Sequence, residues 1–192
     1  MEKLTGLRKI KTAVFISGTG SNLKNLIKFS KTKKSPIVID LIISNTALAK
    51  GLRYADQFNI KKKVFNFKNN KINNNNILIY LKKNQIEFIC LAGFMKILSS
   101  SFIKKFNGKI INIHPSLLPR YKGLNTHERA IKNKDKFAGC SVHYVSAKLD
   151  SGRIIMQKKI RINAKDTLIS LSKKVLKKEH QLYPDSILKI FN

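Results

Sequence analysis

Two patterns of apolar residues alternate along most of the chain. Short continuous apolar runs favour buried strands, whereas apolar residues at every third or fourth position favour helices with one buried face. The expected strands before the last third of the chain comprise residues 12–17, 36–44, 63–67, 87–92 and 109–113. The expected helices comprise residues 23–29, 47–58, 73–84, 99–106 and 126–134. This alternation predicts right-handed β-α-β units and a mainly parallel sheet with helices on both faces.

The last third of the chain has a different pattern. Residues 138–146 and 153–162 predict two strands separated by a short turn at Gly152, which favours an antiparallel, hairpin-like extension of the sheet. Residues 166–191 predict one long helix or two, because Pro184 cannot donate a backbone hydrogen bond inside a helix. The expected fold class is therefore a Rossmann-like α/β fold with a mainly parallel twisted sheet and an antiparallel extension near the C-terminal part.

Length and composition fit a single domain. We expect it to comprise residues 1–192, with residues 1–10 as a flexible lead, and a hydrophobic fraction of 43% is enough to form a core. Cys90 and Cys140 lie far apart in apolar segments, which excludes a Cys-x-x-Cys metal site and fits a reducing compartment. The longest apolar runs are strand-sized, and the first residues lack the apolar stretch of a signal peptide. We therefore expect a cytoplasmic protein without a membrane partner.

The chain is strongly basic, with 39 Lys and Arg against 10 Asp and Glu and a formal net charge of +29. Such a charge is typical of proteins that bind nucleic acid or another polyanion. However, the lysines are spread along the whole chain, and Lys, Asn and Ile are all in excess, as in residues 69–76. Coding bias toward A- and T-rich codons would produce this composition without any ligand. We therefore favour a compositional origin of the charge over a nucleic-acid surface.

Three segments place polar residues where expected strands end, which is where open α/β sheets bind ligands. The first comprises residues 17–22, between a strand and a helix. Gly18 and Gly20 allow a tight turn, and the free N–H groups of a helix start can bind a phosphate. The segment matches neither a dinucleotide fingerprint nor a P-loop. A plain turn with Ser21 or Asn22 as the helix N-cap explains it equally well.

The second segment contains Asn112 and His114 at the end of the expected strand 109–113. Their side chains leave the strand on the same face because they are two residues apart, while Ile111 and Ile113 point to the other face. An amide can stabilise a developing oxyanion, and an imidazole can hold or move a proton near neutral pH, so the pair suits acyl transfer. A hydrogen-bonded Asn and His at a strand end would give the same pattern without catalysis.

The third segment combines His143 with Asp150, which lies in the turn before Gly152. A carboxylate beside an imidazole fixes its tautomer and raises its pKa, which gives a usable general acid. Asp is also a common turn residue before Ser-Gly. Two weaker candidates are His127, at the start of a helix, and Glu179, on the final helix. His, Cys and Asp residues nowhere have the spacing of metal ligands, so we expect no metal.

Taken together, the motifs resemble those of the folate-dependent formyltransferases, from about residue 12 to Tyr183. The motifs that carry the resemblance are SGTGSNL at 17–23, LAGFMKIL at 91–98, INIHPSLLPRYKGL at 111–124, SVHYV at 141–145, LDSGRII at 149–155 and EHQLYP at 179–184. The block at 111–124 indicates the superfamily. The block at 17–23, together with Glu179 and His180, indicates the members that act on glycinamide ribonucleotide.

This resemblance implies formyl transfer from 10-formyltetrahydrofolate to the amine of 5-phosphoribosylglycinamide in purine biosynthesis, by a monomer or homodimer without a metal. It implies catalysis by Asn112, His114 and Asp150. Asp150 would keep His114 charged, and His143 would support the aspartate. The residues implied to bind the substrate phosphate and ribose are Gly20, Ser21, Asn22 and Glu179. The residues implied to line the folate pocket are Met95, Lys96, Ile97, Leu98, Ser146, Ala147, Lys148 and Leu149.

The sequence departs from the family pattern in places. Lys96 replaces a common Arg, Asn125 stands where some members have His, and Lys71 is the candidate for a folate-contacting Arg. Methionyl-tRNA formyltransferases and formyltetrahydrofolate hydrolases share the implied catalytic trio. We expect neither, because each carries a further domain for which this sequence has no counterpart. A non-enzymatic nucleic-acid-binding protein is the remaining alternative.

Overall fold

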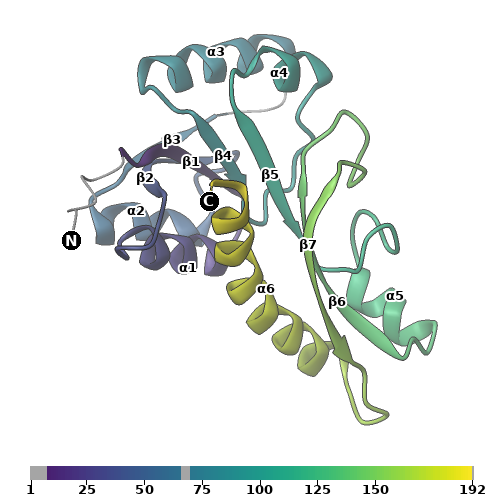
Figure 1. Cartoon of the computed structure of the whole chain (residues 1–192). Helices are drawn as coiled ribbons and strands as arrows, with labels where there is room; N and C mark the ends of the chain where they lie inside the picture. Colours follow the sequence, from purple (N-terminus) through teal and green to yellow (C-terminus); the bar gives the residue numbers. More distant parts are fainter. Residues whose placement is uncertain (1–7, 66–69, 192) are drawn as a thin grey trace.

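The computed structural model describes residues 8–65 and 70–191, without the side chains of residues 70–74. Seven strands form one sheet in the order β3-β2-β1-β4-β5-β6-β7 (Figure 1). The strands are β1 (Ile10–Ile16), β2 (Ile37–Ser44), β3 (Lys61–Val64), β4 (Phe88–Leu91), β5 (Lys109–His114), β6 (Phe137–Tyr144) and β7 (Ile154–Arg161). The helices are α1 (Ser21–Ser30), the short 3-10 helix η1 (Lys50–Leu52), α2 (Arg53–Phe58), α3 (Asn70–Lys83), α4 (Ser100–Lys105), α5 (Thr126–Lys132) and α6 (Leu168–Phe191).

The sheet is parallel from β3 to β5 and antiparallel beyond. Strand β6 pairs antiparallel with β5, and β7 pairs antiparallel with β6. Successive side chains point to opposite faces, so β1 contributes Val14 and Ile16 to one core and Ala13 and Phe15 to the other. Side chains of α1, α2 and α6 complete the first core, and those of α3 and α4 complete the second. The expected α/β fold with an antiparallel extension is confirmed.

The helix expected at residues 47–58 is shorter in the structure, where the chain forms η1 and then α2 from Arg53. A close backbone contact explains the irregular start. A Cβ on Gly51 would lie 2.9 Å from the Cα of Gly20, and the Gly51 N–H donates to the Gly18 carbonyl oxygen at 2.9 Å. The segment before α2 therefore packs against the turn before α1 instead of completing a helical turn.

Pro184 lies inside α6 without ending it, so the structure has one long helix at this position. A proline has no N–H for the carbonyl oxygen four residues earlier, which belongs to His180. Asn25 Nδ2 of α1 donates to this carbonyl oxygen at 2.7 Å instead. Tyr183 and Ile187, on either side of the proline, are fully buried. A hydrogen bond from α1 and core packing together allow the helix to continue.

Some expectations fall partly outside the described residues. Strand β3 begins at Lys61 rather than at residue 63. Residues 66–67 of the expected strand lie outside the described part of the chain, as do residues 1–7 of the expected lead. The side chain of Lys71, the candidate folate contact, is also outside it.

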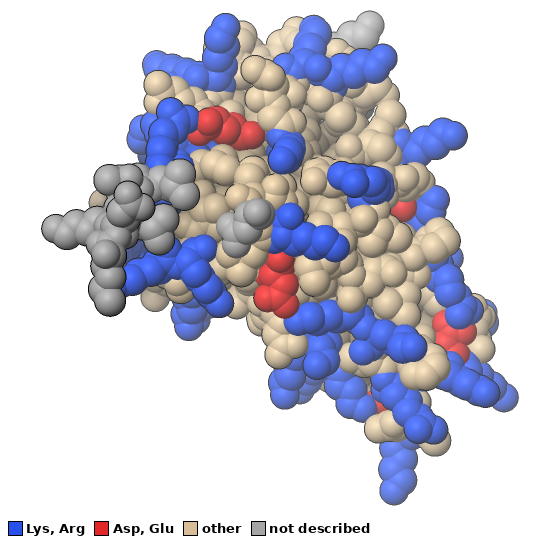
Figure 2. Space-filling view, viewed as in Figure 1, with Lys and Arg blue, Asp and Glu red and all other residues tan. Residues whose placement is uncertain are grey.

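The basic residues lie over much of the face shown in Figure 2 and do not gather in a single patch there. This distribution matches their even spread along the sequence. Within residues 8–65 and 70–191, no helix combines the length and the apolar character that crossing a membrane requires.

Candidate active site

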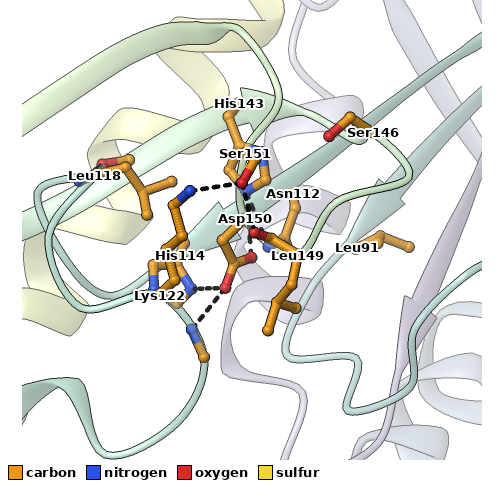
Figure 3. Close-up of polar contacts among 12 residues, drawn as sticks. Leu91, Asn112, His114, Leu118, Lys122, His143, Ser146, Leu149, Asp150 and Ser151 are labelled. Carbon is orange, nitrogen blue, oxygen red and sulfur yellow. Dashed lines mark hydrogen bonds and ion pairs between the residues drawn. The ribbon is translucent and has the colours of Figure 1, made fainter.

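Asn112 and His114 lie at the carboxyl end of β5, in the middle of a group of polar side chains (Figure 3). Ile111 and Ile113 are buried in the core on the opposite face, as the strand period predicts. Strand β6 pairs His143 with Asn112. The antiparallel strand therefore brings a second imidazole beside the amide.

Asp150 reaches these side chains from the turn between β6 and β7. Its Oδ2 lies 3.4 Å from His114 Nδ1, and its Oδ1 lies 3.6 Å from His143 Nε2. The Gly123 N–H donates to Oδ2 at 2.9 Å. A Cβ on Gly152 would lie 1.7 Å from a backbone carbonyl oxygen of β6, so only glycine allows this turn to close onto the strand. The structure thus brings together the side chains of two segments that are separate in the sequence, one with Asn112 and His114 and one with His143 and Asp150.

Backbone carbonyl groups determine which nitrogen of each imidazole carries a proton. His114 Nε2 lies 2.8 Å from the carbonyl oxygen of Tyr121, which can only accept, so Nε2 is protonated. By the same argument, His143 Nδ1 donates to the Tyr144 carbonyl oxygen at 2.8 Å. His143 Nε2 is then an acceptor for Asn112 Nδ2, 3.3 Å away. His143 therefore orients the amide and leaves one N–H of Asn112 for a ligand.

The contact between His114 and Asp150 lacks the proton that would make it a hydrogen bond. A neutral His114 with its proton on Nε2 presents the Nδ1 lone pair to the carboxylate, and the contact becomes a hydrogen bond when either group gains a proton. Burial lowers the pKa of His114 below its ordinary value, although the Tyr121 carbonyl and Asp150 act in the opposite direction. Burial thus has a larger effect on the pKa of His114 than Asp150 has, and the role of Asp150 in holding a charge on His114 stays a prediction.

The carboxyl group of Asp150 has the opposite balance. Burial raises its pKa, but the contact with His143, the Gly123 N–H and the positive charges that His114 and His143 carry when protonated together lower the pKa below its ordinary value. Asp150 is therefore ionised near neutral pH while His114 is neutral. The pair is ready to take up one proton.

A cavity of about 760 Å³ opens above Asn112, His114 and Asp150. Its lining includes large apolar side chains that are about half or more exposed, namely Met95, Ile97, Leu124, Leu149 and Leu168. Exposed apolar side chains around a polar floor are typical of a site for a ligand with an extended apolar or aromatic body.

The residues expected to bind folate divide into three groups. Four of them line the large cavity: Met95, Lys96, Ile97 and Leu149. Three others line an adjoining cavity of about 70 Å³: Leu98, Ser146 and Lys148. Ala147 is exposed and is not among the residues that line these two cavities. The expected contact of Ala147 with folate stays a prediction.

Most of one wall of the large cavity was not expected from the sequence. This wall comprises residues 123–128, of which only His127 was a candidate site residue. Gly123 and Asn125 both have positive φ, which places a tight bend directly before α5. The only signal for this wall in the sequence is a run of turn residues directly before a helix. Periodicity cannot show which way such a loop faces.

The turn before α1 differs from the expected capping arrangement. Helix α1 begins at Ser21, its N-cap is Gly20 with a φ of 76°, and no side chain caps it. Ser21 or Asn22 as N-cap is therefore wrong, since the left-handed conformation falls to the glycine. Asn22 Nδ2 instead donates to Glu179 Oε2 at 2.6 Å in a buried contact. The uncapped N-terminus of α1 thus lies beside a buried carboxyl group.

Comparison with known proteins decides the family. Residues 10–187 match the protein family described as "Formyl transferase". This chain belongs to the formyl transferase family. The family resemblance expected from the sequence motifs is confirmed.

Individual relatives of this formyl transferase have more specific names. Phosphoribosylglycinamide formyltransferase of Haemophilus influenzae is 43% identical over 177 residues, which cover 91% of this chain and 84% of that protein. The crystal structure of phosphoribosylglycinamide formyltransferase from Brucella melitensis has a TM-score of 0.90 at 39% identity and covers 95% of this chain and 96% of that one. The human trifunctional purine biosynthetic protein adenosine-3 is 42% identical over 183 residues. The matched region covers 94% of this chain but only 18% of that longer protein.

Within the described part of this formyl transferase, no group of three or more His, Cys, Asp or Glu side chains could hold a metal ion. Chemistry without a metal stays a prediction from the sequence. The two imidazoles and the carboxylate of the site are instead arranged around each other and around backbone groups.

Replacing Gly20 by Ala in this formyl transferase should lower the free energy of unfolding by about 1–3 kcal/mol, because the residue has a left-handed conformation. The added Cβ would also lie 2.7 Å from the backbone of Gly51. Gly18→Ala is the matched control, since a Cβ there meets nothing within 4 Å. Urea denaturation of the two variants measures the difference, and equal midpoints would contradict this description of the turn.

Acid should destabilise this formyl transferase. Burial lowers the pKa of His114, His127 and His180 below the ordinary value of 6.5. The unfolded chain then binds more protons than the folded chain, so the free energy of unfolding should fall as the pH drops from about 7.5 to about 5. Glu179 acts with the opposite sign, since burial raises its pKa, but it is one group against three. Thermal denaturation should give a lower Tm at the acidic end, and a higher Tm there would refute the assignment.

Proposed function

We propose that this chain is a phosphoribosylglycinamide formyltransferase. It transfers the formyl group of 10-formyltetrahydrofolate to the amine of 5-phosphoribosylglycinamide. The products are formylglycinamide ribonucleotide and tetrahydrofolate, as part of de novo purine (IMP) biosynthesis. The observation that carries the proposal is the meeting of Asn112, His114 and Asp150 on the floor of one large cavity. The names of the bacterial relatives support the same activity.

The large cavity suits the folate. Its flat pterin and benzoyl rings match the exposed apolar side chains of Met95, Ile97 and Leu149. Lys96 lies in the same lining and would meet a carboxylate as a single point charge, without the bidentate fork of an arginine. When bound, 10-formyltetrahydrofolate supplies the activated formyl group.

The turn before α1 suits the phosphate of the ribonucleotide. The N–H groups at the start of this ten-residue helix lack a side-chain cap and carry the positive end of the helix dipole. Asn22 Oδ1 is buried without a hydrogen-bond partner among the described residues, although Nδ2 of the same amide is bound to Glu179. A buried acceptor without a donor costs free energy that a ligand hydroxyl or amine would recover. Glu179 would accept hydrogen bonds from the ribose hydroxyl groups.

The polar side chains divide the chemical work between them. Asn112 has a free N–H and would donate it to the formyl oxygen as negative charge develops there. The amine loses a proton when its nitrogen bonds to the formyl carbon, and the His114–Asp150 pair has room for one proton. The protonated pair would stabilise the same oxygen and deliver the proton to the folate nitrogen that leaves. Holding both substrates in one cavity provides a further large rate factor.

Glu179→Ala should raise the KM for the ribonucleotide about tenfold or more, because a buried hydrogen-bonding carboxylate is removed from the ribose site. The kcat and the KM for folate should change much less. Lys177→Ala, an exposed position on the same helix, is the control and should match the unaltered protein. A rise confined to the KM for folate would show that the two substrate sites are assigned the wrong way round.

The activity is tested by mixing purified protein with 10-formyltetrahydrofolate and following deformylation by absorbance. Three parallel reactions contain glycinamide ribonucleotide, initiator methionyl-tRNA or no acceptor. Rapid deformylation in the reaction with glycinamide ribonucleotide, and in neither of the other two, supports the proposal. Preference for tRNA would identify a methionyl-tRNA formyltransferase, and turnover without an acceptor would identify a hydrolase. Either result would overturn the proposed function.

A further inference from the structure

We propose that Tyr121 is a positioning residue for His114 and Asp150, held in place by a polar anchor on the far side of its loop. For its kinetic effect this inference rests on the proposed function. Apart from this effect, the inference concerns only the position of the Tyr121 loop and which nitrogen of His114 carries the proton. Tyr121 touches no reacting atom in this account and acts through the groups that its loop holds.

Three consecutive residues of the loop contact His114, Asp150 or the neighbour of Asp150 in sequence. The Tyr121 carbonyl oxygen accepts from His114 Nε2 at 2.8 Å. Lys122 Nζ donates to the hydroxyl of Ser151 at 2.6 Å, next to Asp150 in sequence (Figure 3). The Gly123 N–H donates to Asp150 Oδ2 at 2.9 Å. One short segment therefore determines the positions of both the imidazole and the carboxylate.

The backbone of this segment is strained and needs external support. Tyr121 has a φ of 53°, in the left-handed region that a residue with a large side chain adopts at a cost in free energy. Such conformations persist only where surrounding contacts hold them. A relaxed Tyr121 would rotate its carbonyl group away from His114 Nε2.

The support comes from a polar anchor around the tyrosine ring. The Tyr121 hydroxyl donates to Asp135 Oδ2 at 2.7 Å and accepts from Asn133 Nδ2 at 2.8 Å. The guanidinium groups of Arg120 and Arg129 lie 5.3 and 4.9 Å from the ring centroid. Arg120 Nη2 also donates to Asp135 Oδ1 at 2.9 Å, which holds the carboxylate that receives the hydroxyl. Both hydrogen-bonding directions of the phenol are thus satisfied.

Close packing is limited on one side of this loop, and a second directed contact comes from the Ser116 hydroxyl, which donates to the carbonyl oxygens of Arg120 and Tyr121 at 2.6 and 3.3 Å. A cavity of about 350 Å³ borders the loop, and its lining includes Leu117, Tyr121, Asp135 and Phe137. A loop with empty space beside it keeps its position through directed contacts rather than through close packing. Removing the phenol hydroxyl should therefore free the loop to relax.

The test compares Tyr121→Phe with Tyr80→Phe as matched control. The first variant keeps the ring and its contacts with the two arginines but removes the hydroxyl. Tyr80 lies on α3, away from the site, and its ring meets Phe65 edge-on. Histidine side-chain 1H–15N spectra of the full-length protein report the tautomer. In the unaltered protein and in Tyr80→Phe, His114 should be protonated on Nε2, with slow exchange of that proton.

In Tyr121→Phe, the Nε2 proton of His114 should exchange faster, and kcat should fall about tenfold with little change in either KM, as expected when a reacting group is misplaced. Unchanged spectra together with an unchanged kcat would overturn the proposal. A purely structural role would lower Tm while leaving the spectrum and the kcat of the folded protein intact, and that result would also overturn it.

If Tyr121→Phe folds poorly, variants at Asp135 test the same anchor from its other side. Asp135→Ala removes the acceptor of the phenol and should reproduce both effects, whereas Asp135→Asn retains a side-chain oxygen and should restore most of the activity. Equal kcat values for the two Asp135 variants would contradict the anchor. If the unaltered protein shows no formyl transfer, the proposed function fails, but the spectra still decide whether Tyr121 positions His114.

Discussion

Asp150→Asn should lower kcat by about a thousandfold while the protein still binds both substrates, because the change removes the proton-holding carboxylate and little else. Asparagine has the same shape and tolerates the φ of 44° that Asp150 adopts. Its side-chain oxygen can still accept the Gly123 N–H, so the turn should keep its position. An amide cannot take up the proton that the pair with His114 has room for. Steady-state kinetics and equilibrium binding of each substrate measure the two parts of this expectation.

Asp56→Asn is the matched control for Asp150→Asn. Asp56 on α2 forms an exposed ion pair with Lys62 on β3, which is the edge strand of the sheet on the side away from β6 and β7. Removing its charge alters the net charge by the same amount without touching the cavity. A kcat for Asp150→Asn close to that of Asp56→Asn would mean that proton handling at Asp150 is not part of the reaction.

His114→Ala should also reduce kcat by about a thousandfold, since it removes the other half of the proton-accepting pair and one stabilising group for the developing charge. The substrate KM values should change less, because the proposed phosphate and folate contacts are made by other residues. Circular dichroism should verify that the variant folds, since the Tyr121 carbonyl and Asp150 lose a partner.

Chemical rescue separates catalysis from folding in this variant. The missing side chain lined the large cavity, so added imidazole can enter the space and should restore part of the rate. A variant that keeps near-normal kcat without imidazole would leave Asn112 as the only oxyanion donor. That result would refute the role of the imidazole.

The sheet and the placement of Asn112 and His114 side by side could be predicted because short-range rules govern them. The strands of the parallel part are buried on both faces and therefore read as apolar runs. The two-residue period of a strand places Asn112 and His114 on one face, and the register of β6 brings His143 beside them. Asp150 lies in a turn, where periodicity gives no direction. Its place between the strand of His143 and Gly152 made it a candidate, and only the family resemblance grouped it with Asn112 and His114.

The rest of the site could not be predicted because it depends on contacts between distant segments. Helix α2 begins only at Arg53 because of a contact between Gly20 and Gly51, which no local pattern reveals. The proton position on His114 results from the Tyr121 carbonyl in an irregular loop. The lowered pKa of His114 results from burial, which outweighs the neighbouring carboxylate. These features appear only when the whole fold is assembled.

The central claim is that the phosphate turn and the catalytic trio serve one reaction at one edge of the sheet. The most direct measurement is the crystal structure of the Asp150→Asn variant with glycinamide ribonucleotide and 10-formyltetrahydrofolate. We expect the phosphate at the N-terminus of α1, the pterin in the large cavity, and the formyl oxygen within hydrogen-bonding distance of Asn112. A phosphate bound elsewhere, or a formyl group that faces away from Asn112 and His114, would contradict the account.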